Sequence, residues 1–348
     1  VDNGSDTAAI QSALDTLPKG SILRFNVGTY RAIGLVNNRG ISLIGDRGSH
    51  PARASLVSGT QDIFAWGVGS EIEADGSGWI LSMDGRPGGM INTATGDPNQ
   101  EGQLSGAEIA YISFFGKGRT LEAGGIKAQF IDEMLIHNCG FYGLRKAGYW
   151  AKGGVREGNV SDNDFRHCGD ADDSAGDSPD PVRGWAAMML FDVQTEAGDN
   201  IGDHNNFNKY RGNQVSYSLG SACILDSLEV LEDGDDVIFD EQFEGNTWHG
   251  YLQGSVGGSN VLFFSEWVAS ANMRSSPVFI SRAADRIKWI GDKFWFTGDG
   301  GSHLTFESNT TAPNLHDRIA GTYLAQVIGC TFYGNYNNQT NTPFVKIN

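Results

Sequence analysis

Residues 134–143 read MLIHNCGFYG and residues 159–168 read NVSDNDFRHC, and the second stretch repeats the pattern of the first. Each begins with apolar residues, passes through a polar turn that contains Asn or Asp, and reaches a phenylalanine, Phe141 or Phe165. The other copies of this pattern are fainter or more widely spaced, and they end at Phe115, Phe207, Phe243, Trp267, Phe294 and Phe332. A unit this short cannot bury its apolar side alone, so we expect the copies to stack on one another.

Each copy reads as a strand, a sharp turn and a second strand. The segments between the copies read as a third strand of the same coil: GYWAKGG, WAAMMLFDV, HGYLQGS, SPVFISRA, HLTFESN and TPFVKIN. Propeller blades need longer repeats of four antiparallel strands, and leucine-rich repeats need a leucine ladder that this chain lacks. The pattern therefore predicts an all-β protein, a right-handed parallel β-helix that forms one domain.

Composition supports this fold and limits the function. The 348 residues include 48 glycines but only 9 prolines, which indicates many tight turns rather than a disordered tract. The formal net charge of −17 lacks the basic footprint of a nucleic-acid-binding protein, so we expect no nucleic-acid partner. The sequence has no apolar run long enough to span a membrane, which takes about 18 residues, so we expect no membrane insertion. The four cysteines lack metal-ligand spacing and are expected to be free thiols in the core.

The first 60 residues predict a cap followed by the coil. Ser5 or Asp6 precedes a helix with Ala9, Ile10, Leu14 and Leu17 on one face, and Pro18 to Gly20 ends it. We expect residues 1–35 to form this cap and the first strand, and residues 36–348 to form the rungs. An amphipathic helix at this place would cover the open first rung of the stack.

The stretch DTAAIQSALDTLPKGSILRFNVGTYRAIGL, followed by GISLIGDRG, resembles the opening segment of the pectate-lyase-like superfamily, and NVSDNDF resembles its rung repeat. This superfamily includes secreted polysaccharide-degrading enzymes and phage tailspike depolymerases. The resemblance implies a right-handed parallel β-helix and a polysaccharide partner, with no reaction fixed by the fold itself. It also implies a secreted protein or one on a virion surface, and a monomer, or a homotrimer if the protein is a tailspike.

Lysines on neighbouring rungs are the first candidate for catalysis. Lys127 and Lys152 lie 14 and 13 residues before the phenylalanines of their copies, so we expect them on the same exposed face. A uronate lyase needs a cation that neutralises the sugar carboxylate and a base that removes the proton at C5. A lysine beside another cation has a lowered pKa and can act as that base. Lyases of the alginate and chondroitin type on this fold carry a lysine and an arginine on neighbouring rungs, which this pair resembles.

Glycoside hydrolysis by two carboxylates is the alternative, in a soluble enzyme or a tailspike depolymerase. The candidate pair is Asp192 with Glu229, and a second group combines Asp240, Glu241 or Glu244 with Glu266. A third possibility is a solenoid that binds carbohydrate without cleaving it. Lyase action on a uronate-containing polymer is our leading prediction.

Substrate binding is predicted from aromatic and basic residues near the third strand of each rung. Outward-facing aromatic rings would give sugar rings a flat apolar surface. The predicted binding residues are Tyr149, Trp150, Arg166, His167, Trp185, Trp248, Tyr251 and Arg282.

The longest insertion, residues 166–184, is rich in aspartate. Its predicted metal ligands are Asp170, Asp172, Asp173 and Asp177. Oxygen ligands at alternate positions are typical of calcium sites, although the spacing is not that of an EF-hand. The sequence therefore predicts either a loose Ca²⁺ site or a solvated acidic loop.

Overall fold

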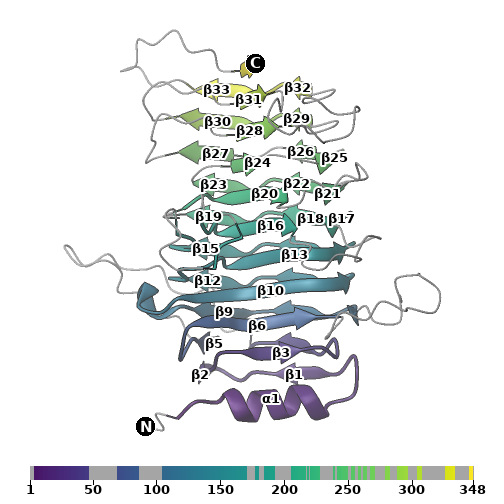
Figure 1. Cartoon of the computed structure of the whole chain (residues 1–348), viewed down its shortest axis with the longest axis vertical. Helices are drawn as coiled ribbons and strands as arrows, with labels where there is room; N and C mark the ends of the chain where they lie inside the picture. The colour runs from purple at the N-terminus through teal and green to yellow at the C-terminus, as the bar shows by residue number, and fades with distance from the viewer. Residues whose placement is uncertain are drawn as a thin grey trace.

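The chain forms a tall stack of short parallel strands with one helix at the N-terminal end (Figure 1). The computed structural model describes residues 4–46, 69–85, 104–170, 177–179, 184–192, 205–216, 218, 220–227, 238–239, 241–249, 252–254, 258–259, 262–264, 267–270, 279–282, 288–296, 304–307, 326–333 and 345–347. Every strand pair within these ranges is parallel, apart from one isolated antiparallel bridge, and the three main strands of each turn of the coil belong to three different sheets.

Three long sheets run the length of the stack. Sheet A contains β1 (Ile22–Arg24), β4 (Ser42–Ile44), β8 (Glu108–Ala110), β11 (Leu135–His137), β14 (Asn159–Ser161), β18 (Lys209–Arg211), β22 (Gln242–Glu244), β26 (Leu262–Phe264), β29 (Lys288–Ile290) and β32 (Gln326–Ile328). Sheet B contains β2 (Gly28–Arg31), β5 (Ser70–Glu73), β9 (Ile112–Phe115), β12 (Gly140–Tyr142), β15 (Asp164–Arg166), β19 (Gln214–Ser216), β23 (Thr247–His249), β27 (Trp267–Ser270), β30 (Lys293–Phe296) and β33 (Thr331–Tyr333).

Sheet C has the longest strands. It contains β3 (Leu35–Asn37), β6 (Gly78–Asp84), β10 (Ala123–Asp132), β13 (Tyr149–Arg156), β16 (Met188–Asp192), β20 (Cys223–Ser227) and β24 (Leu252–Gly254). Next to β24, the strands β28 (Phe279–Arg282), β31 (Leu304–Glu307) and β34 (Val345–Ile347) continue this face. The shorter β7 (Leu104–Ser105), β17 (Asn205–Asn206), β21 (Ile238–Phe239) and β25 (Gly258–Ser259) pair beside it, and a 3-10 turn covers Lys117–Arg119. One coil therefore runs C, A, B, which confirms the predicted right-handed parallel β-helix.

The core is built from columns of identical or similar side chains. Phe114, Phe141 and Phe165 occupy adjacent strands of sheet B and stack with ring centroids 5.2 and 4.5 Å apart. All three are fully buried. Because alternate residues of a strand face opposite sides of its sheet, the residues next to each phenylalanine in its own strand face outward. Stacked apolar columns of this kind are the main source of stability in a solenoid.

The two-residue corner between sheets A and B explains the polar turns of the repeat. Its first residue has positive φ, as at Asn138 (53°) and Asp162 (55°), which Asn, Asp and Gly adopt most easily. Its second residue is buried and forms a ladder through successive rungs. Asn163 donates from Nδ2 to Oδ1 of Asn213 (3.0 Å), and Asn213 donates to Oδ1 of Asn246 (2.9 Å). The ladder satisfies backbone groups that would otherwise be buried without partners.

Several copies of the repeat lie at other positions than predicted. Phe141, Phe165, Phe294 and Phe332 do share the sheet B column, but Phe114 rather than Phe115 belongs to it, and Val268 rather than Trp267. The next two members are Val215 and Trp248. Phe207 is instead half exposed, and Phe243 belongs to sheet A. The prediction failed in these two rungs because valine and tryptophan occupy the place of the phenylalanine. The corner before them is Gly-Asn, which differs from the polar turns of the recognised copies.

The N-terminal helix covers the first rung, as predicted. Helix α1 spans Thr7–Thr16 and buries Ile10 and Leu14, while Ala9 is exposed. Asp6 precedes the helix but does not cap it, since its carboxylate accepts a hydrogen bond from the Arg31 backbone N–H (2.8 Å). The coil begins with β1 at Ile22, within residues 1–35, which were expected to form the cap and the first strand.

The four cysteines are free, as predicted. Cys139, Cys168 and Cys223 are buried, and burial raises the pKa of the Cys139 and Cys168 thiols to about 12. These thiols therefore stay protonated and act as small core side chains.

Candidate functional site

The outward face of sheet C carries the two predicted lysines. Strand alternation places Ala128 and Ala151 in the core and turns Lys127 and Trp150 outward. Lys127 lies opposite Ser82 on one side and opposite Trp150 on the other. Lys152 therefore does not lie directly opposite Lys127.

An irregularity in the pairing of β10 with β13 nevertheless brings Lys152 close to Lys127. Ala128 pairs with Ala151, but the next residue, Gln129, pairs with Gly153, so Lys152 is the extra residue of a β-bulge. The same Gln129 lies opposite Asp84 on the other neighbouring strand. Lys127 and Lys152 are both half-buried, and Asp84 completes the charged group.

The surroundings of Lys127 make its ammonium form less stable than in water. Burial lowers the pKa of Lys127 below its ordinary 10.5, and the positive charges of Lys152 and Lys146 lower it further. The Asp84 carboxylate acts in the opposite direction and does not cancel them. Lys127 and Lys152 form no ion pair with any residue that the structure describes.

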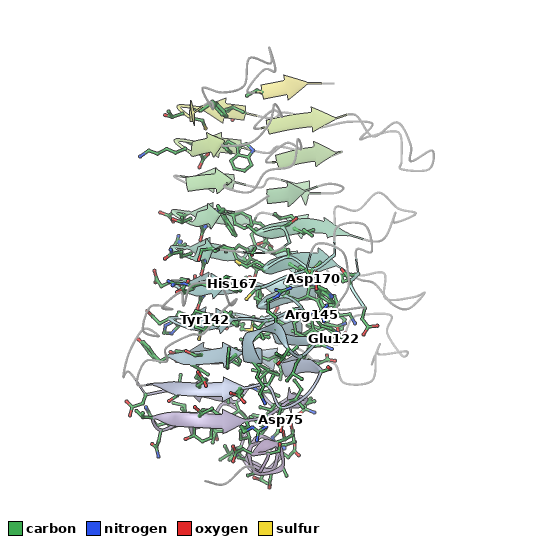
Figure 2. The ribbon with its side chains drawn as sticks, turned by 90° about the vertical axis from the view of Figure 1, so that its left-hand side faces the viewer. Asp75, Glu122, Tyr142, Arg145, His167 and Asp170 are labelled. Carbon is green, nitrogen blue, oxygen red and sulfur yellow. The ribbon has the colours of Figure 1, made fainter. Side chains whose placement is uncertain are left out.

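Other cations near this face are committed to ion pairs. Arg145 donates to Asp170 (3.1 Å) and lies 3.7 Å from Glu122, and these three residues lie together in Figure 2. Arg119 approaches the same Asp170 carboxylate (3.6 Å). The buried Lys146 pairs with Asp177 (3.4 Å). The network holds the two ends of the acidic insertion against the coil, where Asp170 and Trp185 form an antiparallel bridge.

Three tryptophans pack beside the lysines. The rings of Trp79, Trp150 and Trp185 have centroids 5.4 to 5.5 Å apart, and Lys146 lies 5.7 Å from the Trp185 ring. Trp150 and Trp185 are buried, whereas Trp79 is partly exposed. This cluster gives the outward face an apolar wall, with Trp79 as its accessible member.

Several predicted binding aromatics have other roles. Tyr149 and Trp248 are fully buried in the core, so neither contacts a ligand on the surface. Their strand positions turn inward, which the sequence pattern did not resolve. Trp150 and Trp185 do face outward, but each is covered by the cluster and presents no open ring face.

Arg166 and His167 lie away from the lysines. Arg166 belongs to β15 of sheet B and forms a bidentate pair with Asp164 (2.7 and 3.0 Å). His167 follows it in the turn, and its carbonyl accepts a hydrogen bond from Arg119 (3.0 Å). In Figure 2 His167 and Tyr142 lie apart from the Arg145 group.

The aspartates of the insertion do not form a metal site in the described part of the chain. Asp170 is buried between two arginines, and Asp177 pairs with Lys146 from an exposed position. Among the residues that the structure describes, no three His, Cys, Asp or Glu side chains are arranged to hold a metal ion. Asp172 and Asp173 lie outside the described residues, so the Ca²⁺ prediction stays a prediction.

The predicted carboxylate pairs gain no support. Glu241 is fully buried and accepts a hydrogen bond from Asn208 (2.8 Å), and the exposed Glu244 pairs with Arg211 (3.0 Å). The remaining predicted site residues are placed only in part. Glu229, Asp240, Tyr251 and Glu266 lie outside the described residues, whereas Asp192 and Arg282 are placed by their backbones in β16 and β28.

Sequence reasoning missed Asp84, Gln129, Trp79 and Lys146. Asp84 and Trp79 belong to β6, a strand whose rung carries no copy of the repeat that was recognised. The apolar Leu81 and Met83, which are two residues apart and both buried, show the alternation of a strand, and Trp79 and Asp84 lie near its two ends. Glu71 was also missed. Burial, opposed by a hydrogen bond from Thr29, raises its pKa to about 7, but it lies on sheet B, away from this face.

Comparison with known proteins identifies the fold. No family model matches the sequence, and no curated protein matches it significantly. Solved structures do match. The ORF18 protein of Geobacillus virus E2 aligns with a TM-score of 0.61 at 15% identity, over 99% of this chain and 59% of that one. An alginate lyase from Paenibacillus sp. aligns with a TM-score of 0.59 at 9% identity, over 98% and 95%.

The A-module of the Azotobacter vinelandii mannuronan C-5 epimerase AlgE6 aligns with a TM-score of 0.58 at 10% identity, over 99% of this chain and 94% of that one. These likenesses are too distant in sequence to show more than the fold. The chain has a right-handed parallel β-helix fold. In the described residues no helix is long and apolar enough to cross a membrane.

Proposed function

We propose that the protein is a secreted polysaccharide lyase that acts on a uronate-containing polymer at the outward face of sheet C. The observation that carries the proposal is the position of Lys127: half-buried, outward-facing, with a lowered pKa and with Lys152 beside it. A lysine is rarely held in such surroundings for stability, because burial and a like charge both destabilise the ammonium form.

The reaction follows from these two lysines. The polymer's carboxylate approaches Lys152, whose positive charge stabilises the negative charge that develops when C5 loses its proton. The neutral amine of Lys127 takes that proton and becomes an ammonium ion. The electron pair left at C5 forms a double bond to C4 and expels the glycosidic oxygen, which leaves with a proton from water. The partly exposed Trp79 supplies an apolar face for a neighbouring sugar ring.

The structural neighbours fit this chemistry. One is called an alginate lyase and another a mannuronan C-5 epimerase, and elimination and epimerisation at C5 both begin with removal of the C5 proton. For the alternative of hydrolysis by a carboxylate pair, Glu241 and Glu244 are engaged in internal contacts, whereas Glu229, Asp240 and Glu266 lie outside the described residues.

The experiment is a substrate panel of alginate, polygalacturonate, a glycosaminoglycan and neutral glucans. A lyase creates an unsaturated uronate that absorbs ultraviolet light, whereas a hydrolase releases reducing ends without this absorbance. We expect absorbance with at least one uronate polymer and none with the glucans. Release of reducing ends from a neutral glucan, without absorbance on any uronate polymer, would contradict the proposal.

A further inference from the structure

A hollow on sheet A, a different sheet from the one that carries the lysines, has the chemistry of a second site. It has a volume of about 470 Å³, within the range of small-molecule sites, and lies at the N-terminal end of sheet A. Its walls combine an aromatic ring, three charged side chains and two aliphatic ones: Tyr111, Arg24, Asp46, Glu108, Ile22 and Ile44. Ile22 is 53% exposed, so part of this wall is open and apolar.

Tyr111 occupies a position where the fold does not favour it. It is the corner residue between β8 and β9, with φ at 59°. The equivalent corners of later rungs hold residues that adopt positive φ easily: Asn138, Asp162, Gly212, Gly245, Gly291 and Gly329. An aromatic residue in this conformation is destabilising relative to glycine, so the backbone of this corner does not favour Tyr111.

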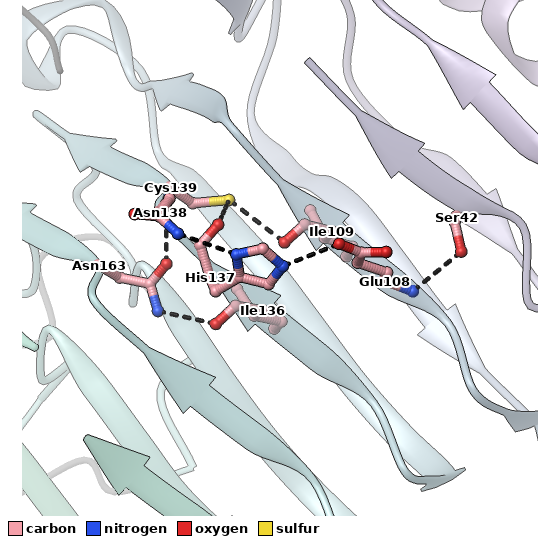
Figure 3. Close-up of polar contacts among 8 residues, drawn as sticks. All are labelled: Ser42, Glu108, Ile109, Ile136, His137, Asn138, Cys139 and Asn163. Carbon is pink, nitrogen blue, oxygen red and sulfur yellow. Dashed lines mark hydrogen bonds and ion pairs between the residues drawn. The ribbon is translucent and has the colours of Figure 1, made fainter. Parts of the chain in front are cut away.

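Glu108 is held in place by its neighbours. Asn138 donates from Nδ2 to Nδ1 of His137 (2.9 Å), so in the neutral ring the proton lies on Nε2 and is donated to Oε1 of Glu108 (2.8 Å) (Figure 3). The Tyr111 ring packs edge-to-face on His137, with centroids 5.5 Å apart. The Glu108 carboxylate therefore has a fixed orientation at the wall of the hollow.

We infer that this hollow is a second, non-catalytic saccharide-binding site. A sugar ring presents apolar C–H faces and a rim of hydroxyl groups. Tyr111 and Ile22 match the faces, and the carboxylates of Asp46 and Glu108 with the Arg24 guanidinium match the rim, since carboxylates accept and guanidinium donates hydrogen bonds. This inference rests on the proposed function, because a site of this kind holds the polymer whose other segments reach sheet C.

The test counts binding sites in a protein that cannot cleave its ligand. In the Lys127→Ala background, an alginate tetrasaccharide is titrated by calorimetry. We expect two sites in this parent and one after Tyr111→Gly is added. Glycine suits the corner, so the variant keeps or raises its melting temperature, and lost binding does not reflect unfolding. Asp162→Gly, at the same corner of a later rung, is the matched control and should keep both sites.

The catalytic readout separates this inference from the proposed function. In the otherwise wild-type protein, Tyr111→Gly should raise KM for long alginate about 3- to 10-fold, with kcat and the cleavage of short oligosaccharides unchanged. A single site in the parent, or two sites in the Tyr111→Gly variant, overturns the second site alone. Absence of cleavage of every uronate polymer by the wild type instead overturns the proposed function, and the inference with it.

Discussion

The corner between sheets A and B and the outward face of sheet C are both rich in polar side chains, yet they have opposite roles. At the corner, Asn163 and Asn213 are buried, and their amides bond to each other and to the backbone. On sheet C, Lys127 and Lys152 are half-buried and have no ion-pair partner among the described residues. A satisfied polar group stabilises the fold, whereas an unsatisfied cation on an open face is available to a ligand.

The largest expected effect is on catalysis. Lys127→Ala should reduce kcat/KM on the cleaved uronate polymer by about 10²- to 10⁴-fold, because it removes the proposed base. The melting temperature should stay the same or rise, since the half-buried amine is replaced by an apolar group. The control is Lys209→Ala, an exposed lysine on sheet A, which should keep full activity. Equal rates for the two variants would show that Lys127 is only a surface residue.

The second effect is on stability at the corner. Asn213→Ala removes the donor to the Val160 carbonyl (2.8 Å) and the acceptor for the Asn163 N–H (3.1 Å). We expect a loss of about 3 kcal/mol in the free energy of unfolding, because both buried partners lose their bonds. Chemical denaturation measures this loss, and Ser161→Ala on the outward side of the adjacent strand should change little. A neutral Asn213→Ala would mean that the ladder does not stabilise the coil.

The third prediction concerns Glu71, a carboxyl group with a raised pKa that lies on sheet B, away from the two lysines. The Glu71 pKa is raised to about 7, so its protonated form gives the folded state stability that is complete below the unfolded pKa of about 4.5. This stability is lost as pH rises through about 7. Glu71→Gln should therefore flatten the pH dependence of stability in that range, by about 3 kcal/mol at most, without a change in kcat. Loss of activity would place part of the site on sheet B.

The fourth prediction uses pH to couple the two lysines. Because the base must be neutral, kcat/KM should rise with pH and level off above the pKa of Lys127, which lies below 10.5. Lys152→Gln removes a cation that lowers this pKa, so the midpoint should move to higher pH in addition to any loss of rate. An unchanged midpoint would mean that the two charges do not interact.

The smallest effect is expected at the aromatic wall. Trp79→Ala removes the accessible ring of the tryptophan cluster and should raise KM about 2- to 10-fold with little change in kcat, as expected for binding shared by ground and transition states. Steady-state kinetics on polymer measures this. A large fall in kcat instead would mean that Trp79 orders the lysines.

The sequence predicted the architecture better than the site, for a physical reason. A stacking repeat leaves its mark in every rung, so the third strands and the N-terminal helix were found from apolar patterns alone. The direction in which a side chain points depends on register, and a single bulge at Lys152 moved it out of line with Lys127. Tyr149 and Trp150 are adjacent, yet one is in the core and the other is outside. Composition cannot distinguish them.

Ion pairs between residues that are far apart in the sequence could not be predicted either. Asp170 belongs to an acidic run that is typical of a calcium loop, but the fold places Arg119 and Arg145 against it. These residues are 51 and 25 positions away in the sequence. Only the stacking of rungs makes them neighbours.

The fate of the substrate C5 proton distinguishes elimination at Lys127 from hydrolysis. The cleaved uronate polymer is incubated with protein in D₂O under conditions where wild-type cleavage is partial, and the residual polymer and the products are analysed by proton NMR. The account predicts loss of the C5 proton and appearance of the C4–C5 double bond with wild type, and neither with Lys127→Ala. Cleavage by wild type in which every C5 proton is retained would contradict it, since that result requires hydrolysis.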